Sequence, residues 1–316
     1  MREGAVTLPV HPLQRIPGVA IMLGLLVVVF GAFAPGFLSV ANVSNVLVQS
    51  TILMLLALPM TLIIMTEGLD LSMGAVLTLT SLVVAIVSLA TGSMLAGLAA
   101  AVAVGIAFGT INGWLVSVIG IPPFVATLGT LGMAQGLSLI VSDGQSVVGI
   151  PHTLRDIYSG TLLGIPLPIV MALVTYFAFD SLLYRTRFGT YIFALGGNRE
   201  ALRYAGQSPT KLLIAVYAIG GLMAGIAGLL MTARMNSGHP TAGLGLEFDA
   251  IAAVAVGGTS FERGNGWLPG TALGVMAVGV LRNGINLMAL PSSVQVASVG
   301  ALVIFALFFD GLRSRS

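Results

Sequence analysis

Residues 45–66 read NVLVQSTILMLLALPMTLIIMT and contain no charged side chain. A helix needs about 20 mostly apolar residues to cross the hydrocarbon core of a bilayer, so this stretch predicts a transmembrane helix. Similar runs follow one another from residue 17 to residue 310, and 57% of the chain is hydrophobic while only 8% is charged. Soluble domains carry roughly one quarter charged residues. The sequence therefore predicts an all-α polytopic membrane protein in which residues 1–316 form a single transmembrane domain.

The lengths of the apolar runs, and the glycine, proline and charge breaks between them, predict about ten transmembrane helices. They are expected at residues 17–35, 45–66, 71–91, 94–118, 122–142, 162–184, 210–234, 246–258, 266–289 and 292–310. Residues 1–16 are a predicted cytoplasmic stub. Ala32-Phe33-Ala34 resembles a signal-peptidase site, but the preceding run is long enough to span, so we expect an uncleaved first helix.

The distribution of basic residues predicts how the chain is oriented, because lysine and arginine concentrate on the cytoplasmic side of membrane proteins. With the amino terminus inside and ten crossings, the cytoplasmic cations are Arg2, Arg15, Arg185, Arg187, Arg199, Arg203, Lys211, Arg263, Arg313 and Arg315. The outer cations are then Arg155, Arg234 and Arg282. Both termini are therefore expected in the cytoplasm. The basic residues form no dense run, so we expect no nucleic-acid partner.

Two segments interrupt the apolar pattern with acidic residues at or near membrane depth: residues 67–72, with Glu67 and Asp70, and residues 247–258, with Glu247 and Asp249. Non-helical backbone exists at that depth only where protein or a water-filled cavity satisfies its polar groups. Each break therefore suggests a discontinuous helix beside a solute pathway. The alternative is that Asp70 or Ser72 caps the third helix while Glu67 lies in the inner interface.

The deeply placed acids need protein or water around them, because a charged side chain at the bilayer centre costs about 2.5 to 3.5 kcal/mol on insertion scales. Arg282 is a candidate partner for Glu247 or Asp249. Alternatively, its long aliphatic side chain carries the guanidinium group to the outer interface.

An internal repeat accompanies these breaks. Asn112-Gly113, Val125-Ala126 and Gly129 recur at one constant offset as Asn283-Gly284, Val296-Ala297 and Gly300, and each copy follows an acidic break at nearly the same distance. In the ten-helix topology the two copies run in opposite directions through the membrane. The pattern therefore predicts an inverted repeat of five plus five helices, with some helices short or discontinuous, as in many transporters.

The longest predicted cytoplasmic segment, residues 185–209, contains GGNREALRYAG at positions 196–206. It predicts a short helix bounded by glycines. Arg199, Arg203 and Tyr204 would share one face, while Ala201 and Ala205 offer a small-residue face for close docking. From composition alone, an ordinary basic loop is an equally good interpretation.

Residues 188–201, FGTYIFALGGNREA, followed by Ala205-Gly206, resemble the coupling loop of the ribose-type permeases of bacterial ABC importers. The resemblance extends to EGLDLSMG at 67–74, PFVATLGT at 123–130, DAIAAV at 249–254 and GGTS at 257–260, in family order over most of the chain.

This resemblance implies an inner-membrane permease that pairs with a second, identical or homologous permease. It also implies cytoplasmic ABC ATPases, which would hold the ATP and magnesium, and a periplasmic binding protein that delivers a sugar-like solute. The residues it assigns to ATPase coupling are Gly197, Asn198, Arg199, Glu200, Ala201, Arg203, Tyr204, Ala205 and Gly206.

A neutral sugar is bound by uncharged hydrogen-bonding groups more than by full charges, so amides and hydroxyls on the spans are the candidate pathway residues. They are Asn112, Thr127, Gln135, Asn283 and Asn286, with Phe124 as a stacking surface and Glu67, Asp70, Glu247 and Asp249 at the breaks. For each of these amides and hydroxyls, hydrogen bonding between helices is the competing interpretation.

The sequence contains no nucleotide-binding loop of the Gly-Lys-Ser/Thr type, since its sole lysine, Lys211, lies between Thr210 and Leu212. It also contains no cysteine, and its histidines, His11, His152 and His239, are far apart. We therefore expect no enzymatic activity, no metal site and no cofactor bound by this chain. The rival functions are an ion-coupled secondary transporter or a passive channel, with the four acids at the breaks as ion sites, and a membrane scaffold without transport.

Overall fold

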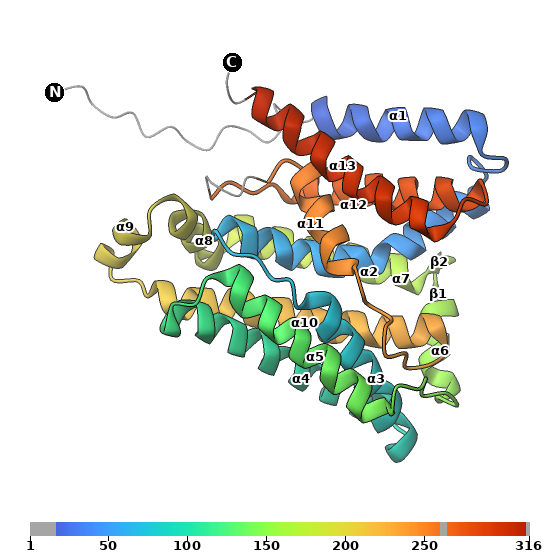
Figure 1. The fold of residues 1–316 in the computed structure, drawn as a ribbon, viewed down its shortest axis with the longest axis horizontal. Helices are drawn as coiled ribbons and strands as arrows, with labels where there is room; N and C mark the ends of the chain where they lie inside the picture. Colours follow the sequence, from blue (N-terminus) through green and yellow to red (C-terminus); the bar gives the residue numbers. More distant parts are fainter. Residues whose placement is uncertain (1–16, 260–263, 314–316) are drawn as a thin grey trace.

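The computed structural model describes residues 17–259 and 264–313, so the predicted stub 1–16 lies outside the described residues, as do Arg2, Arg15, Arg263 and Arg315. The described chain is all-α apart from one small hairpin (Figure 1). Its helices are α1 (Pro17–Phe33), α2 (Val40–Met65), α3 (Met73–Thr91), α4 (Met94–Trp114), α5 (Pro123–Ser142), α6 (His152–Ser159), α7 (Leu167–Arg185), α8 (Arg187–Gly197), α9 (Arg199–Tyr204), α10 (Pro209–Met235), α11 (Leu246–Val256), α12 (Leu268–Leu287) and α13 (Ser292–Arg313). A π-helical segment, Leu115–Ile119, extends α4, and β1 (Thr161–Leu162) pairs antiparallel with β2 (Ile165–Pro166).

Each predicted span corresponds to one helix, and seven of the described helices are long and apolar enough to cross a membrane: α2, α3, α4 with its π-helical extension, α5, α7, α10 and α12. The segments Gly18–Phe33 and Ser292–Leu302 are shorter apolar helices. Two boundaries differ from the prediction. The second span begins five residues earlier, at Val40, because the Ser39 hydroxyl accepts a hydrogen bond from the Asn42 backbone N–H and caps the helix. The sixth begins later, at Leu167, because the hairpin precedes it.

Helix α2 lies at the centre of the bundle. Its second half is buried almost completely, with Leu55, Leu58 and Met60 all fully inaccessible. Figure 1 shows α1, α11, α12 and α13 on one side of it and α3, α4, α5 and α10 on the other. The second half of α2 is apolar on all sides, and a helix of this kind packs in the interior of a protein.

Helices α4 and α10 pack with their backbones in direct proximity, through Gly105 and Gly109 on α4 and Gly221 and Gly225 on α10. A Cβ atom added to Gly221 would lie 3.0 Å from the backbone nitrogen of Gly109, and one added to Gly225 would lie 3.0 Å from the Cα atom of Val102. In a membrane the hydrophobic effect does not drive one helix onto another, because lipid tails are as apolar as the helix surfaces. Small residues favour helix association instead, because they let the backbones approach closely and gain van der Waals contact. The glycines therefore fix the distance between these two helices.

The two ends of the bundle differ in structure. Helices α8 and α9 project at one end, and helix α6 and the β1–β2 hairpin lie at the opposite end (Figure 1). Helix α10 begins directly after α9, so its last turn, with Arg234, reaches toward the end opposite α9.

The first predicted break is a real interruption of helical structure, whereas most of the second, residues 247–258, lies within the short helix α11, and the non-helical segment precedes it. The chain leaves α2 at Met65 and enters α3 at Met73, passing through Glu67 with a φ angle of 59°. Helix α11 is short and follows Gly245, whose φ angle is 87°, in the left-handed region where glycine is favoured. The two interrupted regions pack against each other, since a Cβ atom on Gly74 of α3 would lie 2.6 Å from the carbonyl oxygen of Gly243.

Candidate functional site

The predicted coupling segment forms a short exposed helix held by one buried side chain. Helix α9 lies between Gly197 and Gly206, as predicted, and begins where the Asn198 side-chain oxygen accepts a hydrogen bond of 2.9 Å from the Ala201 backbone N–H. Leu202 is buried in a cluster with Leu195, Leu212 and Leu213. This anchor joins α9 to α8 and to the first turns of α10.

The other members of the segment point away from the chain. All nine predicted coupling residues are exposed, and 89% of Tyr204 is accessible. They are Gly197, Asn198, Arg199, Glu200, Ala201, Arg203, Tyr204, Ala205 and Gly206. Helix α8, which the sequence did not predict as a separate helix, begins at Arg187 with its cap on Thr186. The result is an exposed surface of guanidinium and aromatic groups on a well-anchored helix.

The first acidic break is organised by a buried hydrogen-bond network. The Asp70 carboxylate accepts hydrogen bonds from the backbone N–H and hydroxyl of Ser72, at 2.9 and 2.6 Å. The Asn112 amide donates to the Ser72 hydroxyl at 2.8 Å, and Asn112 accepts from the Thr130 hydroxyl at 2.7 Å. Asp70 therefore orders the turn that precedes α3, while the Ser72 side chain makes no capping bond of its own.

The backbone at this break also has its partners. The hydroxyls of Thr127 and Tyr217 both donate to the Leu69 carbonyl oxygen, each at 3.3 Å. Side chains of α5 and α10 thus satisfy a backbone carbonyl of this non-helical turn, as non-helical backbone in a membrane protein requires, and Asn112 of α4 bonds its polar side chains. Asp70, Asn112 and Thr127, three of the predicted pathway residues, form one network.

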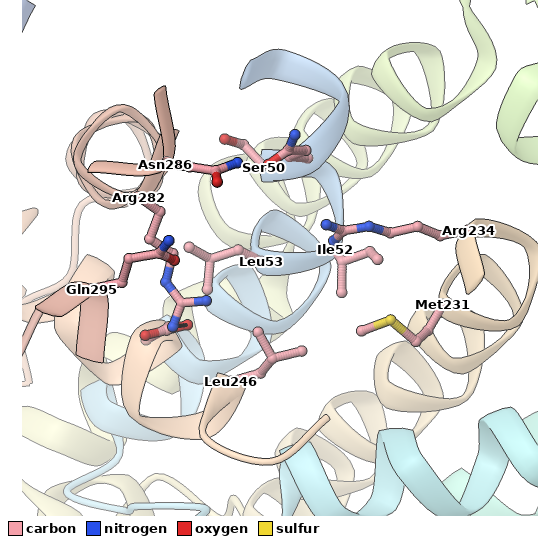
Figure 2. Close-up of a pocket in the computed structure, with 12 residues that line it drawn as sticks. Ser50, Ile52, Leu53, Met231, Arg234, Leu246, Arg282, Asn286 and Gln295 are labelled. Carbon is pink, nitrogen blue, oxygen red and sulfur yellow. Dashed lines mark ion pairs between the residues drawn. The ribbon is translucent and has the colours of Figure 1, made fainter. Parts of the chain in front are cut away.

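The second acidic break lines a cavity of about 220 Å³ between α2, α10, α11, α12 and α13. Of the ten predicted pathway residues, Asp249 and Asn286 line it. The Asp249 carboxylate forms an ion pair with the Arg282 guanidinium at 2.5 Å, and its side chain is only 4% exposed. Figure 2 shows Ser50, Asn286, Gln295 and Arg282 gathered on one side of the cavity, with Leu53, Leu246 and Met231 around the remainder.

The remaining predicted pathway residues lie elsewhere. Asn283 exchanges two hydrogen bonds with Asn42 of α2, at 2.9 and 3.0 Å, and so joins α12 to α2. The Gln135 amide donates to the Pro240 carbonyl oxygen at 2.9 Å. Glu67 and Phe124 are exposed.

Glu247 is buried against the first turn of α3. One of its carboxylate oxygens accepts a hydrogen bond of 3.2 Å from the Gly245 backbone N–H. Its other oxygen occupies the place where a side chain on Gly74 would lie. Gly74 therefore permits the contact between the two broken regions.

Sequence reasoning missed several cavity residues, namely Gln49, Ser50, Gly279 and Gln295. A helical periodicity signal existed for one pair, because Arg282 and Asn286 are four residues apart and therefore share a face of α12. The contribution of α2 and α13 could not be read from the sequence, since it depends on which helices become neighbours.

Comparison with known proteins places these features in a family. The family described as "Branched-chain amino acid transport system / permease component" matches residues 42–307. The chain belongs to this permease family. The D-allose transport system permease protein of Escherichia coli K12 is 36% identical over 94% of this permease and 92% of its own length. The ribose import permease protein of the same strain is 36% identical over 93% and 92%, and that of Bacillus subtilis 168 is 36% identical over 92% and 91%. No solved structure matches the permease.

Membership identifies this permease as a multi-pass membrane component of a bacterial ABC importer. Permeases of this family are transport subunits without catalytic activity, so ATP hydrolysis is not a reaction of this chain. The described residues contain no cluster of three or more His, Cys, Asp or Glu side chains placed to hold a metal ion.

Proposed function

We propose that this permease carries a neutral monosaccharide across the bacterial inner membrane, driven by ATP hydrolysis in partner subunits. The proposal of a sugar rests on the relatives, since proteins named for D-allose and ribose align with it over nearly their whole length. The observation that carries the ATP-driven mechanism is helix α9, an exposed and capped helix with a buried Leu202 anchor. ATP and magnesium would be bound by the partner ATPase, and a periplasmic binding protein would deliver the sugar.

We propose ten crossings with an inverted repeat of five plus five helices. The offset that relates Asn112 to Asn283 carries the first residues of α2, α3, α4 and α5 to within three residues of the first residues of α10, α11, α12 and α13. Two copies separated by an odd number of crossings run in opposite directions, which is the inverted arrangement of many transporters. In this topology α8, α9 and both termini are cytoplasmic, and α6 and the hairpin are periplasmic.

We propose that the exposed residues of α9 and its flanks, from Gly197 to Gly206, dock into the partner ATPase. Closure of the ATPases on nucleotide would move α9 as a rigid body, because Leu202 ties it to α8 and α10. Helix α10 packs on α4 through glycines and contacts α2 and α3. A displacement of α9 would therefore bias the bundle between two packings, which is how rigid elements transmit a switch.

We propose that the predicted pathway residues have different roles. Asp249 and Asn286 would contact solute in the cavity between α2 and α12. Asp70, Asn112 and Thr127 would maintain the broken helix that allows the halves to move. Gln135, Glu247 and Asn283 would contribute to the path in a conformation that exposes them, and Glu67 and Phe124 are already exposed.

The second permease would pack against α5. Gly129, Gly132 and Gly136 lie on one face of this helix, and a Cβ atom on any of them would meet nothing within 4 Å in the chain. The spacing from Gly132 to Gly136 is that of the small-residue motif that brings transmembrane helices into close contact. Gly300, the repeat partner of Gly129 on α13, is equally open.

Gly132→Leu is expected to weaken the association of two permeases without unfolding either one, because the leucine would project from a face that has no neighbour within the chain. The loss of close packing should lower dimer stability by about 1 to 3 kcal/mol, the usual cost of overpacking a tight contact. The yield of crosslinked dimer in membranes measures this loss of stability. Gly24→Leu on α1, which also has open space, is the matched control; equal dimer yields for both variants would reject α5 as the interface.

Co-purification tests the proposed function. The permease is expected to bind an ABC ATPase encoded beside its gene, and the complex reconstituted in liposomes with its binding protein should hydrolyse ATP faster when sugar is present. A permease that binds no ATPase and moves solute alone down an ion gradient would instead be a secondary transporter.

A further inference from the structure

The cavity between α2, α10, α11, α12 and α13 has the features of a binding site, because some of its polar groups have no partner within the described protein. The Ser50 hydroxyl is buried, and neither it nor the Nε atom of Arg282 has a hydrogen-bond partner among the described residues. A buried polar atom without a partner costs about 1 to 3 kcal/mol. Both residues line the cavity, although these two atoms are themselves covered in this conformation, so a small movement of their side chains would let a polar ligand supply the missing partners.

The lining has the two-sided character that a sugar ring requires. Amide and hydroxyl groups of Gln49, Ser50, Asn286 and Gln295 supply both donors and acceptors. Apolar side chains, including Leu53 and Met231, complete the wall. A monosaccharide ring matches this arrangement, because its hydroxyls form a polar rim while its C–H groups form apolar faces.

The charges in the cavity favour a neutral ligand. The Arg282 guanidinium lies against the Asp249 carboxylate at 2.5 Å, so each neutralises the other. Arg234, the other charged residue of the lining, is exposed, and water screens its charge. An anionic ligand would therefore find no unmatched positive charge among the buried groups of the lining.

The size and position of the cavity agree with one small solute. Its volume of about 220 Å³ is below the range of about 300 to 1,000 Å³ that holds drug-sized ligands. It lies at the end of the bundle opposite α9, because it is lined by the last turn of α10 and the first turns of α13. A solute released at that end of the protein would reach it first.

We propose that each permease chain holds one neutral monosaccharide in this cavity, as an outer site within the chain and separate from any path between two chains. The inference rests on the proposed function of sugar import. Asn286 and Gln295 would hydrogen-bond the sugar hydroxyls, and the Asp249–Arg282 pair would present fixed acceptor and donor groups beside them.

The cysteine-free sequence allows a direct test by site-specific labelling. Leu53→Cys and Leu246→Cys each place one thiol in the apolar wall of the cavity of the full-length permease in nanodiscs, leaving Asn286 and Gln295 intact, and Gln145→Cys places one on an exposed loop as the control. Each is labelled with a methanethiosulfonate reagent in the presence of D-ribose, D-allose, L-arabinose or ribose 5-phosphate. At a sugar concentration about ten times its dissociation constant, labelling in the cavity should slow about tenfold, because mass action leaves about one site in eleven free.

The expected result is that a neutral sugar protects both cavity thiols and leaves Gln145→Cys unchanged. Protection by ribose 5-phosphate alone would overturn the neutral class, and equal labelling with and without sugar at millimolar to molar concentrations would overturn the site. ATP-driven uptake of the same sugars by the assembled importer is measured in parallel. Uptake without protection rejects only the cavity, whereas protection without uptake of any of the three sugars supports the cavity and contradicts the proposed function.

Discussion

A permease with Arg203→Glu and Tyr204→Ala in α9 is expected to lose its partner ATPase while remaining folded. Both side chains are exposed and lie outside the leucine cluster that anchors the helix, so their replacement leaves the internal packing intact. Arginine and tyrosine are the residue types that dominate interface energies, with losses of about 2 kcal/mol or more each, which is about 30-fold in affinity. Pull-down of the ATPase and sugar-stimulated ATP hydrolysis measure the effect.

The matched control is Arg155→Glu on α6, which makes the same charge reversal on an exposed residue at the opposite end of the bundle. It should leave ATPase binding unchanged. If the α9 variant still binds the ATPase at its normal affinity, or if Arg155→Glu weakens binding as much, α9 is not the docking element.

Arg282→Leu is expected to be the most destabilising single substitution in the cavity. It would leave the Asp249 carboxylate, which is 4% exposed, without its cation. Removing one partner of a fully buried ion pair costs about 3 to 5 kcal/mol, whereas removing both is often nearly neutral. Because the Arg282 side chain is 35% exposed, the loss here should lie at or below the lower end of that range. The double variant Asp249→Leu with Arg282→Leu should therefore recover most of the loss, as measured by thermal unfolding in detergent.

Arg234→Leu provides the comparison within the same cavity. Arg234 is exposed and forms no ion pair with any described residue, so its removal should change stability by about 0.5 kcal/mol or less. An Arg282→Leu protein as stable as the Arg234→Leu protein would mean that the ion pair contributes nothing to the fold.

Apolar run length predicted the helices well, because lipid imposes one requirement on every span. The segment between α5 and α7 lies mostly between two predicted spans, and the sequence predicted no separate element there. It forms α6 and the hairpin, whose amphipathic and very short elements give no membrane signal. The short helix at α9 was predictable, since Asn198 and the glycines at 197 and 206 are local signals that act within a few residues.

The candidate site was less accessible to sequence reasoning. Asp249 and Asn286 were predicted as pathway residues and line the cavity, but Gln49, Ser50 and Gln295 were not predicted. Their roles depend on α2 and α13 meeting α12, which no periodicity within one helix encodes. The pairing of Arg282 was left open between two acids and the interface for the same reason, and the structure joins it to Asp249.

ATP-driven sugar import by this permease is tested by sugar uptake into liposomes that contain the permease, its ATPase and its binding protein. Radiolabelled ribose, allose and arabinose are followed with ATP inside, with a non-hydrolysable analogue inside, and with a proton or sodium gradient alone. We expect accumulation of at least one sugar only when ATP and all subunits are present. Accumulation by the permease alone under an ion gradient, unaffected by ATP, would contradict ATP-driven import.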